Sequence, residues 1–171
     1  FNVDYFEKEA YLTQSGQLYQ EAACMAHGKT YCFGPTFRAE KSKTRRHLTE
    51  FWMVEPEVAF MDLEADMDLA EDFLCSIVAR ALENHANELQ DILERDISAL
   101  ENVRKPFHRL TYDDAVQRIR ELRDACTDPV RKAELELSEG ADFGSPHETE
   151  LTAQYPRPII VHRFPSQCKA F

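Results

Sequence analysis

The stretch FRAEKSKTRRHLTEF, residues 37–51, decides the fold of this chain. It joins two segments, residues 30–40 and 50–60, that are rich in the aromatic and β-branched residues typical of strands. Between them the chain is polar and charged, so the sequence predicts a β-hairpin with a long loop. Basic side chains crowd this loop: Lys41, Lys43, Arg45, Arg46 and His47. Charge alone leaves two interpretations about equal, a phosphate-binding loop and a solvated basic turn that could touch RNA backbone.

The two predicted strands separate polar from apolar side chains, because side chains alternate along a strand. On the first strand, Thr36, Arg38 and Glu40 share a face. On the return strand, that face carries Phe51, Met53, Glu55 and Glu57, and the opposite face carries Trp52, Val54, Val58 and Phe60. An arginine and three carboxylates beside an aromatic ring are costly to bury and of little use on a plain surface. We therefore favour a polar ligand site on this face.

A nucleotide would match this face. Phe51 offers a flat surface on which a base could stack, Arg38 could hold the α-phosphate, and the basic loop could reach the outer phosphates. When a carboxylate attacks an α-phosphate, two negative groups approach each other, so a cation between them is the main catalytic requirement. The predicted chemistry is adenylation, with Arg38 as the catalytic residue and without a general base.

The amino-acid composition limits the classes of protein to which the chain can belong. Its 171 residues are 43% hydrophobic and 11% aromatic, which suits one domain with a core of its own. The formal net charge of −11 means that any anion site is local. Apolar runs fall short of the roughly 18 residues of a membrane span, and the first residues do not resemble a signal peptide. We expect a cytoplasmic protein without a membrane partner and, from the two chain ends, a fragment of a longer one.

Two features could indicate a metal site, and we favour a structural interpretation of both. The cysteines are odd in number, scattered and without a C-x-x-C pair, so we expect reduced, mostly buried thiols. They are Cys24, Cys32, Cys75, Cys126 and Cys168. Residues 62–72 carry six acids and no base, which is typical of a solvated helix N-terminus favoured by the helix dipole. We predict no bound metal among these residues.

The remaining chain reads as a mixture of helices and strands. Gly28 should end a helix, and Thr111 should cap one through its side chain. The predicted elements are a short strand at 11–15, a helix at 17–27, a long and perhaps interrupted helical region at 62–103, shorter helices at 111–123 and 129–137, a turn-rich segment at 140–146, and a strand at 159–161. The fold class is therefore α+β.

The residues FRAE (37–40) and TRRHLTEF (44–51) resemble the second signature motif of class II aminoacyl-tRNA synthetases, in the form used by the aspartate, asparagine and lysine subgroup. The resemblance covers nearly the whole chain, including GADFG at 140–144 and KAF at 169–171. It implies a catalytic domain with an antiparallel β-sheet flanked by helices. Three segments follow: the substrate-binding segment and motif 2 hairpin at 1–61, a helical region with an insertion at 62–138, and a return to the core sheet at 139–171.

Within the subgroup, LTQSGQL (12–18) and EFWMVEPE (50–57) look like the asparaginyl enzymes. Aspartyl enzymes usually have S-P-Q-L, where this chain has Gly16, and a Lys where it has Gln20. Loss of that charge suits a neutral amide. The resemblance implies an enzyme that activates asparagine with ATP and transfers it to tRNA(Asn). Mg²⁺ would be bound mainly through ATP and residues beyond this chain, and the full-length protein would be a homodimer.

The resemblance also implies roles for single residues. Arg38 would contact both the α-phosphate of ATP and the carboxylate of the amino acid. The predicted ATP-binding residues are Arg38, Glu40, Arg46, His47, Leu48 and Phe51. The predicted amino-acid-binding residues are Gln17, Gln20, Glu21, Arg38 and Glu55, among which Gln17 and Glu21 are inferred from the hydrogen bonds that an amide needs. We interpret His147 and Glu148 as structural.

The first and third class II motifs and the anticodon-binding domain are not found in the sequence, so we expect about half a site here and activity in the full-length protein. Two alternatives stay open. One is an aspartyl-tRNA synthetase or a synthetase-like paralogue that makes asparagine, against which Gly16 and Gln20 speak. The other is a synthetase-derived module that only binds RNA or a partner protein. The set of Arg38, Glu40, His47 and Phe51 argues against such a module, since a domain without ATP binding has no use for these residues.

Overall fold

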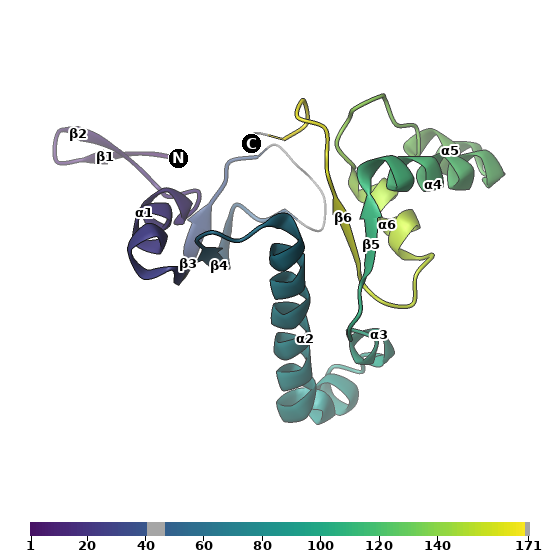
Figure 1. Cartoon of the computed structure of the whole chain (residues 1–171), viewed down its shortest axis with the longest axis horizontal. Helices are drawn as coiled ribbons and strands as arrows, with labels where there is room; N and C mark the ends of the chain where they lie inside the picture. Colours follow the sequence, from purple (N-terminus) through teal and green to yellow (C-terminus); the bar gives the residue numbers. More distant parts are fainter. Residues whose placement is uncertain (41–46, 170–171) are drawn as a thin grey trace. The chain divides into compact units, whose positions relative to one another are not determined.

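The computed structural model describes residues 1–40 and 47–169. The chain divides into two compact units, Phe1–Asp62 and Leu63–Phe171, which are described separately (Figure 1). No helix in the described part of the chain combines the length and apolar character needed to cross a membrane.

The first unit combines one helix with two β-hairpins. Its elements are β1 (Asn2–Tyr5), β2 (Lys8–Tyr11), α1 (Gln17–His27), β3 (Lys29–Phe37) and β4 (Glu50–Val58). The predicted helix is confirmed at both ends, and Gly28 terminates it with φ of 79°, a left-handed conformation that suits glycine. The strand predicted at 11–15 is wrong, because β2 already ends at Tyr11.

The predicted hairpin is confirmed as the antiparallel pair β3–β4. Thr36 lies opposite Phe51, Gly34 opposite Met53, and Cys32 opposite Glu55. The polar and apolar faces separate as predicted. On the apolar face, Phe33 and Trp52 place their ring centres 5.0 Å apart, and both side chains are exposed.

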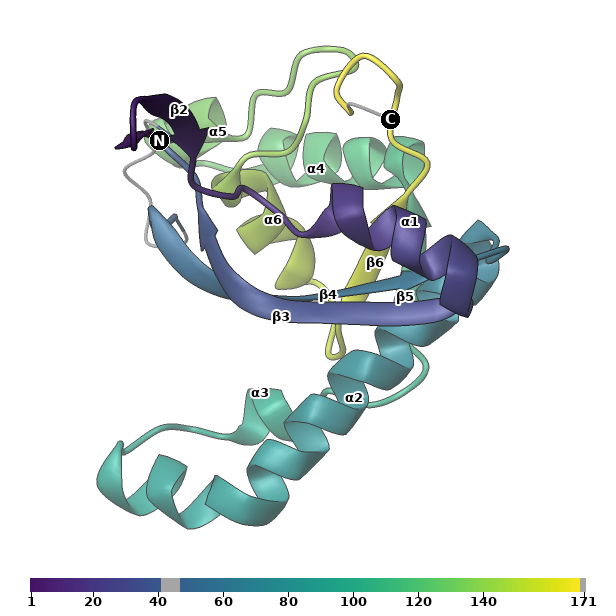
Figure 2. The same cartoon turned by 90° about the vertical axis from the view of Figure 1, so that its left-hand side faces the viewer.

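Helix α1 packs against both strands of this hairpin (Figure 2). Its residues Gln20 and Cys24 are buried. Since Gln20 donates a hydrogen bond to the main-chain oxygen of Glu55, the helix is fastened directly to β4. The Glu55 side chain, on the polar face, accepts from the N–H of Gly16 directly before α1, so the polar face is the one nearer to α1.

The second unit contains the long helix and a small parallel sheet. Its elements are α2 (Leu63–Asn87), the π-helix η1 (Glu88–Ile92), α3 (Ser98–Glu101), β5 (His108–Thr111), α4 (Tyr112–Ala125), α5 (Pro129–Glu134), α6 (Ser145–Thr152) and β6 (Ile159–His162). An interrupted helical region, the two shorter helices and the last strand were predicted. The side chain of Thr111 caps α4 as predicted, accepting from the Asp114 N–H at 3.2 Å. Strand β5 and helix α6 were not predicted.

The core of the second unit lies between its helices and the β5–β6 pair. Ala115 and Ile119 of α4 and Leu151 of α6 are fully buried. The strands pair in parallel, with Leu110 opposite Val161, and both of these side chains pack against that cluster. In Figure 1, α4 and α6 lie on one side of β5 and β6, and α2 lies on the other.

The acidic start of α2 is mostly exposed to solvent, as predicted, but three of its carboxylates also contact an arginine, which was not predicted. Arg109 of β5 donates to Glu71 at 2.9 Å and to Glu64 at 3.2 Å, and also contacts Asp68. Glu71 is only 4% exposed. These carboxylates are spaced by four and three residues, which places them on one side of the helix. The hydrogen bonds that Asp68 and Glu71 accept from Arg109 raise the pKa of this guanidinium.

The structural role predicted for His147 is confirmed. This side chain is buried. Its Nδ1 accepts from the Gly144 N–H at 2.9 Å, and its Nε2 lies 3.3 Å from the Glu136 carbonyl oxygen. The ring thus satisfies a free N–H at the start of α6 and ties this helix to the preceding loop.

Candidate active site

Arg38 lies at the end of β3, next to the aromatic ring that was predicted to bind a base. Its guanidinium carbon is 5.5 Å from the centre of the Phe51 ring, within the range of cation–π attraction. Its Nε donates to the Gln14 carbonyl at 3.4 Å, and its main-chain N–H donates to the Thr49 carbonyl at 3.0 Å. The cation is therefore held between the 12–16 loop and the start of β4.

Glu55, on the same face, is surrounded by hydrogen-bond donors. The Ser15 hydroxyl donates to Oε2, and the Gly16 N–H donates to Oε1 at 3.0 Å. The Cys32 thiol donates to Oε1 at 3.4 Å. The hydrogen bond from Ser15 is the main cause that lowers the pKa of Glu55, followed by those from Gly16 and Cys32 and by the charge of Arg38. The carboxylate is thus held in its charged form.

Cys32 and Gly16 fit closely together beneath this carboxylate. A carbon atom added at the Cβ position of Gly16 would lie 2.5 Å from the Cys32 sulfur, so only glycine fits there without a shift. Burial and the neighbouring Glu55 raise the pKa of the Cys32 thiol. The thiol therefore keeps its proton and remains a donor.

Four of the residues predicted to bind the amino acid form two hydrogen-bonded pairs, Gln17 with Glu21 and Gln20 with Glu55. Gln17 donates through Nε2 to Glu21 at 3.1 Å. The Nε2 of the buried Gln20 donates to the Glu55 main-chain oxygen at 2.5 Å, and its Oε1 has no hydrogen-bond partner among the described residues. Gln20 thus fastens α1 to β4 instead of projecting into open space.

The remaining predicted ATP-binding residues are exposed or lie outside the described residues. His47 and Glu40 form an ion pair of 3.6 Å when the imidazole is protonated. The side chain of Leu48 is 68% exposed. Arg46, together with Lys41, Lys43 and Arg45, lies outside the described residues.

The structure thus brings Arg38, Phe51 and Glu55 to one face of the hairpin, as the alternation along the strands predicted. Sequence reasoning missed the donors Ser15 and Cys32. The 12–18 stretch was singled out only for its likeness to asparaginyl enzymes, and Cys32 was counted only as a buried thiol. The alternation did contain a signal for Cys32, because it lies on the same face as Thr36 and Arg38.

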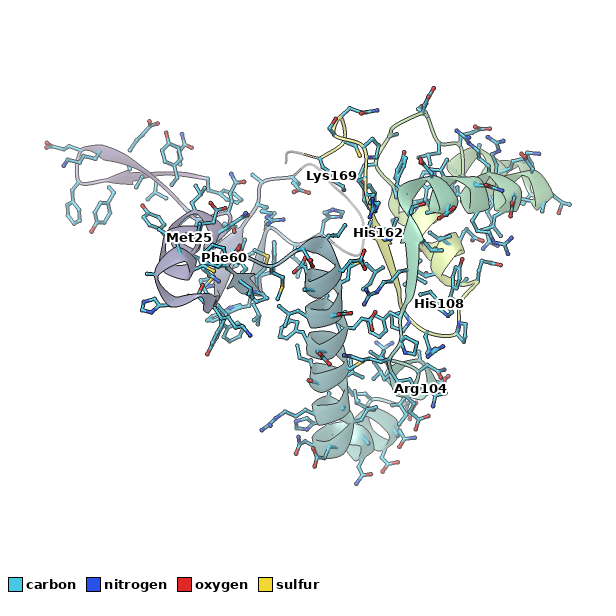
Figure 3. The ribbon with its side chains drawn as sticks, in the orientation of Figure 1. Met25, Phe60, Arg104, His108, His162 and Lys169 are labelled. Atoms are coloured by element: carbon cyan, nitrogen blue, oxygen red, sulfur yellow. The ribbon has the colours of Figure 1, made fainter. Side chains whose placement is uncertain are left out.

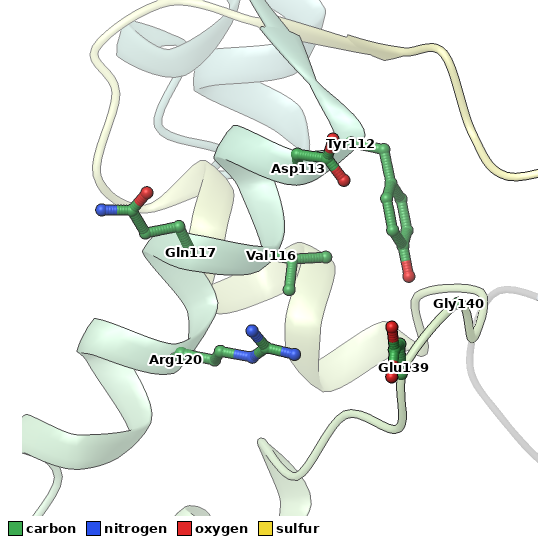
Figure 4. A pocket seen from close by; sticks show the side chains of 7 residues that line it. All are labelled: Tyr112, Asp113, Val116, Gln117, Arg120, Glu139 and Gly140. Carbon is green, nitrogen blue, oxygen red and sulfur yellow. The ribbon is translucent and has the colours of Figure 1, made fainter.

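Two of the open grooves among the described residues are lined without Arg38, Phe51 or Glu55. One, of about 400 Å³, runs between α1 and the end of β4 and includes Met25 and Phe60, labelled in Figure 3. The other, of about 610 Å³, lies in the second unit, where Arg120 of α4 points toward Glu139 (Figure 4). Tyr112 lines this groove and donates its hydroxyl to the Ala141 carbonyl at 2.7 Å. Neither groove was predicted.

The chain is similar to known proteins along its whole length. The asparagine–tRNA ligase of Sorangium cellulosum is 60% identical to it over 172 residues, which cover 100% of this chain and 38% of that protein. The asparagine–tRNA ligase of Chloroflexus aurantiacus is 58% identical over 172 residues, with the same coverage. The chain thus spans less than half of the length of these relatives.

The fold is similar to a solved synthetase structure. The asparaginyl-tRNA synthetase of Pyrococcus horikoshii, complexed with asparaginyl-adenylate, matches with a TM-score of 0.86 and 38% sequence identity, covering 99% of this chain and 36% of that one. A family model described as class II tRNA synthetases (D, K and N) matches residues 1–171. The chain therefore belongs to the class II tRNA synthetases of the aspartate, lysine and asparagine group.

Proposed function

We propose that the chain is part of the catalytic domain of an asparagine–tRNA ligase, which forms asparaginyl-adenylate from asparagine and ATP and transfers asparagine to tRNA(Asn). The observation that supports this most directly is the placement of a cation, Arg38, and a fixed carboxylate, Glu55, on one hairpin face beside Phe51. The relatives named asparagine–tRNA ligase support the choice of amino acid. The complete enzyme would act in the cytoplasm as a homodimer.

In the proposed reaction, the carboxylate of asparagine attacks the α-phosphate of ATP, an acyl–phosphate bond forms, and pyrophosphate leaves with the electron pair of the broken bond. Arg38 lies between the two negative groups and offsets the charge that builds up as they meet. Phe51 would stack on adenine, Glu40 would belong to the ATP site, and Arg46, His47 and Leu48 would lie along the phosphates. Because no proton has to be removed from the attacking carboxylate, the site needs no general base.

Mg²⁺ would enter with ATP. The described residues do not assemble three or more metal-binding side chains, so the part of the chain that the structure describes does not fit a magnesium site of its own. The phosphates of ATP are its natural ligands. The proposed roles of Arg38 and Phe51 do not depend on where the ion sits.

The amino-acid side of the site suits a substrate that donates N–H groups. Glu55 is a charged acceptor, and Gln17 and Glu21 of α1, which are hydrogen-bonded to each other, would add an amide and a second carboxylate. An ammonium or amide group can donate to these oxygens. A side-chain carboxylate, as in aspartate, would be repelled by them.

Amino-acid-dependent exchange of pyrophosphate into ATP by the complete enzyme tests this proposal. We expect exchange with asparagine and not with aspartate. Arg38→Ala should reduce the asparagine-dependent rate about 100-fold or more, as expected when a group that stabilises the transition state is lost. Lys29→Ala, which removes an exposed cation at the other end of β3, is the matched control and should leave the rate unchanged.

Each of the other possible results of this exchange experiment would support a different conclusion. Exchange with aspartate alone would indicate an aspartyl enzyme or a paralogue that makes asparagine. No exchange with either amino acid would indicate a module that only binds. A normal rate in Arg38→Ala would remove Arg38 from its catalytic role while leaving the choice of amino acid intact.

A further inference from the structure

The carboxylate of Glu55 has nearly all of its acceptor capacity filled by the protein. An ionised carboxylate offers about four acceptor positions, two on each oxygen. Oε1 accepts from the Gly16 N–H and from the Cys32 thiol, and Oε2 accepts from the Ser15 hydroxyl. One position on Oε2 is left for a substrate N–H.

We infer that Gly16 and Cys32 are positioning residues for amino-acid selection: they fill Oε1 of Glu55 and thereby present a single acceptor on Oε2 to one N–H of the substrate. This inference rests on the proposed function. Neither residue contacts the substrate in this scheme. Both act by fixing the side-chain angle and the charge of Glu55, so that its remaining lone pair has one direction.

Gly16 meets two separate requirements at this position. It must lack a side chain, because an added Cβ would lie 2.5 Å from the Cys32 sulfur. It must also keep its N–H, which donates to Glu55. Proline meets neither requirement, although the φ of Gly16, −84°, is close to what proline adopts. The φ angle of residue 16 would therefore accept proline. Proline would instead remove the hydrogen bond to Glu55 and would clash with Cys32.

These two requirements can be separated by mutation. The same added Cβ would lie 3.5 Å from the Cβ of Cys32, an ordinary contact distance. Shortening Cys32 to alanine therefore makes room for a side chain at position 16. Gly16→Ala/Cys32→Ala keeps the N–H and removes the clash, whereas Gly16→Pro/Cys32→Ala removes the clash and the N–H. The two double variants therefore differ at the nitrogen of residue 16, where proline removes the donor to Glu55 and places its ring Cδ in the position of that hydrogen.

The test measures the KM for asparagine and the KM for ATP in the exchange reaction of the complete enzyme. We expect Gly16→Pro/Cys32→Ala to have an asparagine KM about tenfold above that of Gly16→Ala/Cys32→Ala, as for the loss of one hydrogen bond to a charged group. The ATP KM should be the same in both. Equal asparagine KM values, or a parallel rise of both KM values, would overturn the inference.

A second series does not depend on the folding of the proline variant. Cys32→Ala should raise the asparagine KM severalfold, and Cys32→Ser, which restores a donor, should bring it back toward the parent value. Cys32→Ser behaving like Cys32→Ala would count against a donor role for position 32. If the parent enzyme itself shows no asparagine-dependent exchange, the proposed function has failed, and that result is distinct from any difference among these variants.

Discussion

At the scale of single residues, the charge of Glu55 depends on the donors around it. The Ser15 hydroxyl is the main cause that lowers the pKa of this carboxyl, so Glu55 keeps its charge to a lower pH than an ordinary glutamic acid does. Ser15→Ala should raise this pKa. The asparagine kcat/KM follows the ionisation of the free enzyme. As the pH is lowered, kcat/KM should therefore begin to fall at a higher pH than in the parent. When the pH is raised, it should still reach its plateau. A pH series of kcat/KM checks this.

The control for this residue is Thr13→Val. It removes another hydroxyl of the same loop, one that bonds the Ser15 main chain and, among the described contacts, does not touch Glu55. If the acidic side of the kcat/KM profile shifted equally in both variants, the effect would come from a change in the loop and not from the loss of the Ser15 donor.

Arg38, Phe51 and Glu55 could be placed on one face from the sequence, because strand alternation is local and has a fixed period. The donors to Glu55 could not. Ser15 and Gly16 lie 40 and 39 residues before Glu55 in the chain, and no local pattern states that two such distant segments meet. Gln20 shows the same limit: its position was correctly placed on the helix, but its bond to the Glu55 main chain depends on how the helix packs.

At the scale of elements, α2 and β5 are joined by Arg109, which suggests a stability test. Arg109→Met would leave the buried Glu71 without its partner, and removing one member of such a pair costs much more than removing an exposed one. We expect the melting temperature of the chain to fall by roughly 5 °C or more. Glu64→Gln, which alters a partner of Arg109 with 63% of its side chain exposed, should have little effect. Similar melting temperatures for the two variants would show that Arg109 does not fasten the elements.

The elements that sequence patterns found are those with strong local signals. Helix α1 has a glycine at its end, and α4 has a threonine cap. Strand β5 has only four residues, and its partner, β6, lies about 50 residues away. Helix α6 starts in a Gly-Ser-Pro stretch that was interpreted as a turn. Proline in fact occupies its first turn, where the missing N–H costs nothing.

At the scale of the whole chain, the buried apolar residues are divided unequally between the two units. Among the described residues, Cys24 is the one buried hydrophobic residue of the first unit, and all other buried hydrophobic residues lie in the second unit. The described residues predicted to bind ATP all lie in the first. A hairpin with so little core is only marginally stable without further packing, so the contacts that fix Arg38 and Glu55 are easily lost in the isolated chain and have to be restored when the ligand binds.

The isolated 171-residue chain should therefore bind ATP weakly. Ordering the hairpin subtracts from the binding free energy, and the exposed Trp52 and Phe33 indicate that its apolar face lacks cover. We expect a Kd for ATP with Mg²⁺ above about 1 mM by calorimetric titration, which corresponds to a binding free energy weaker than about −4 kcal/mol. Slow amide hydrogen exchange in α4 would verify that the chain is folded in the same sample. A micromolar Kd that is lost in Arg38→Ala would contradict this prediction and show that the hairpin forms a sufficient site, whereas a micromolar Kd unchanged by Arg38→Ala would place ATP elsewhere on the chain.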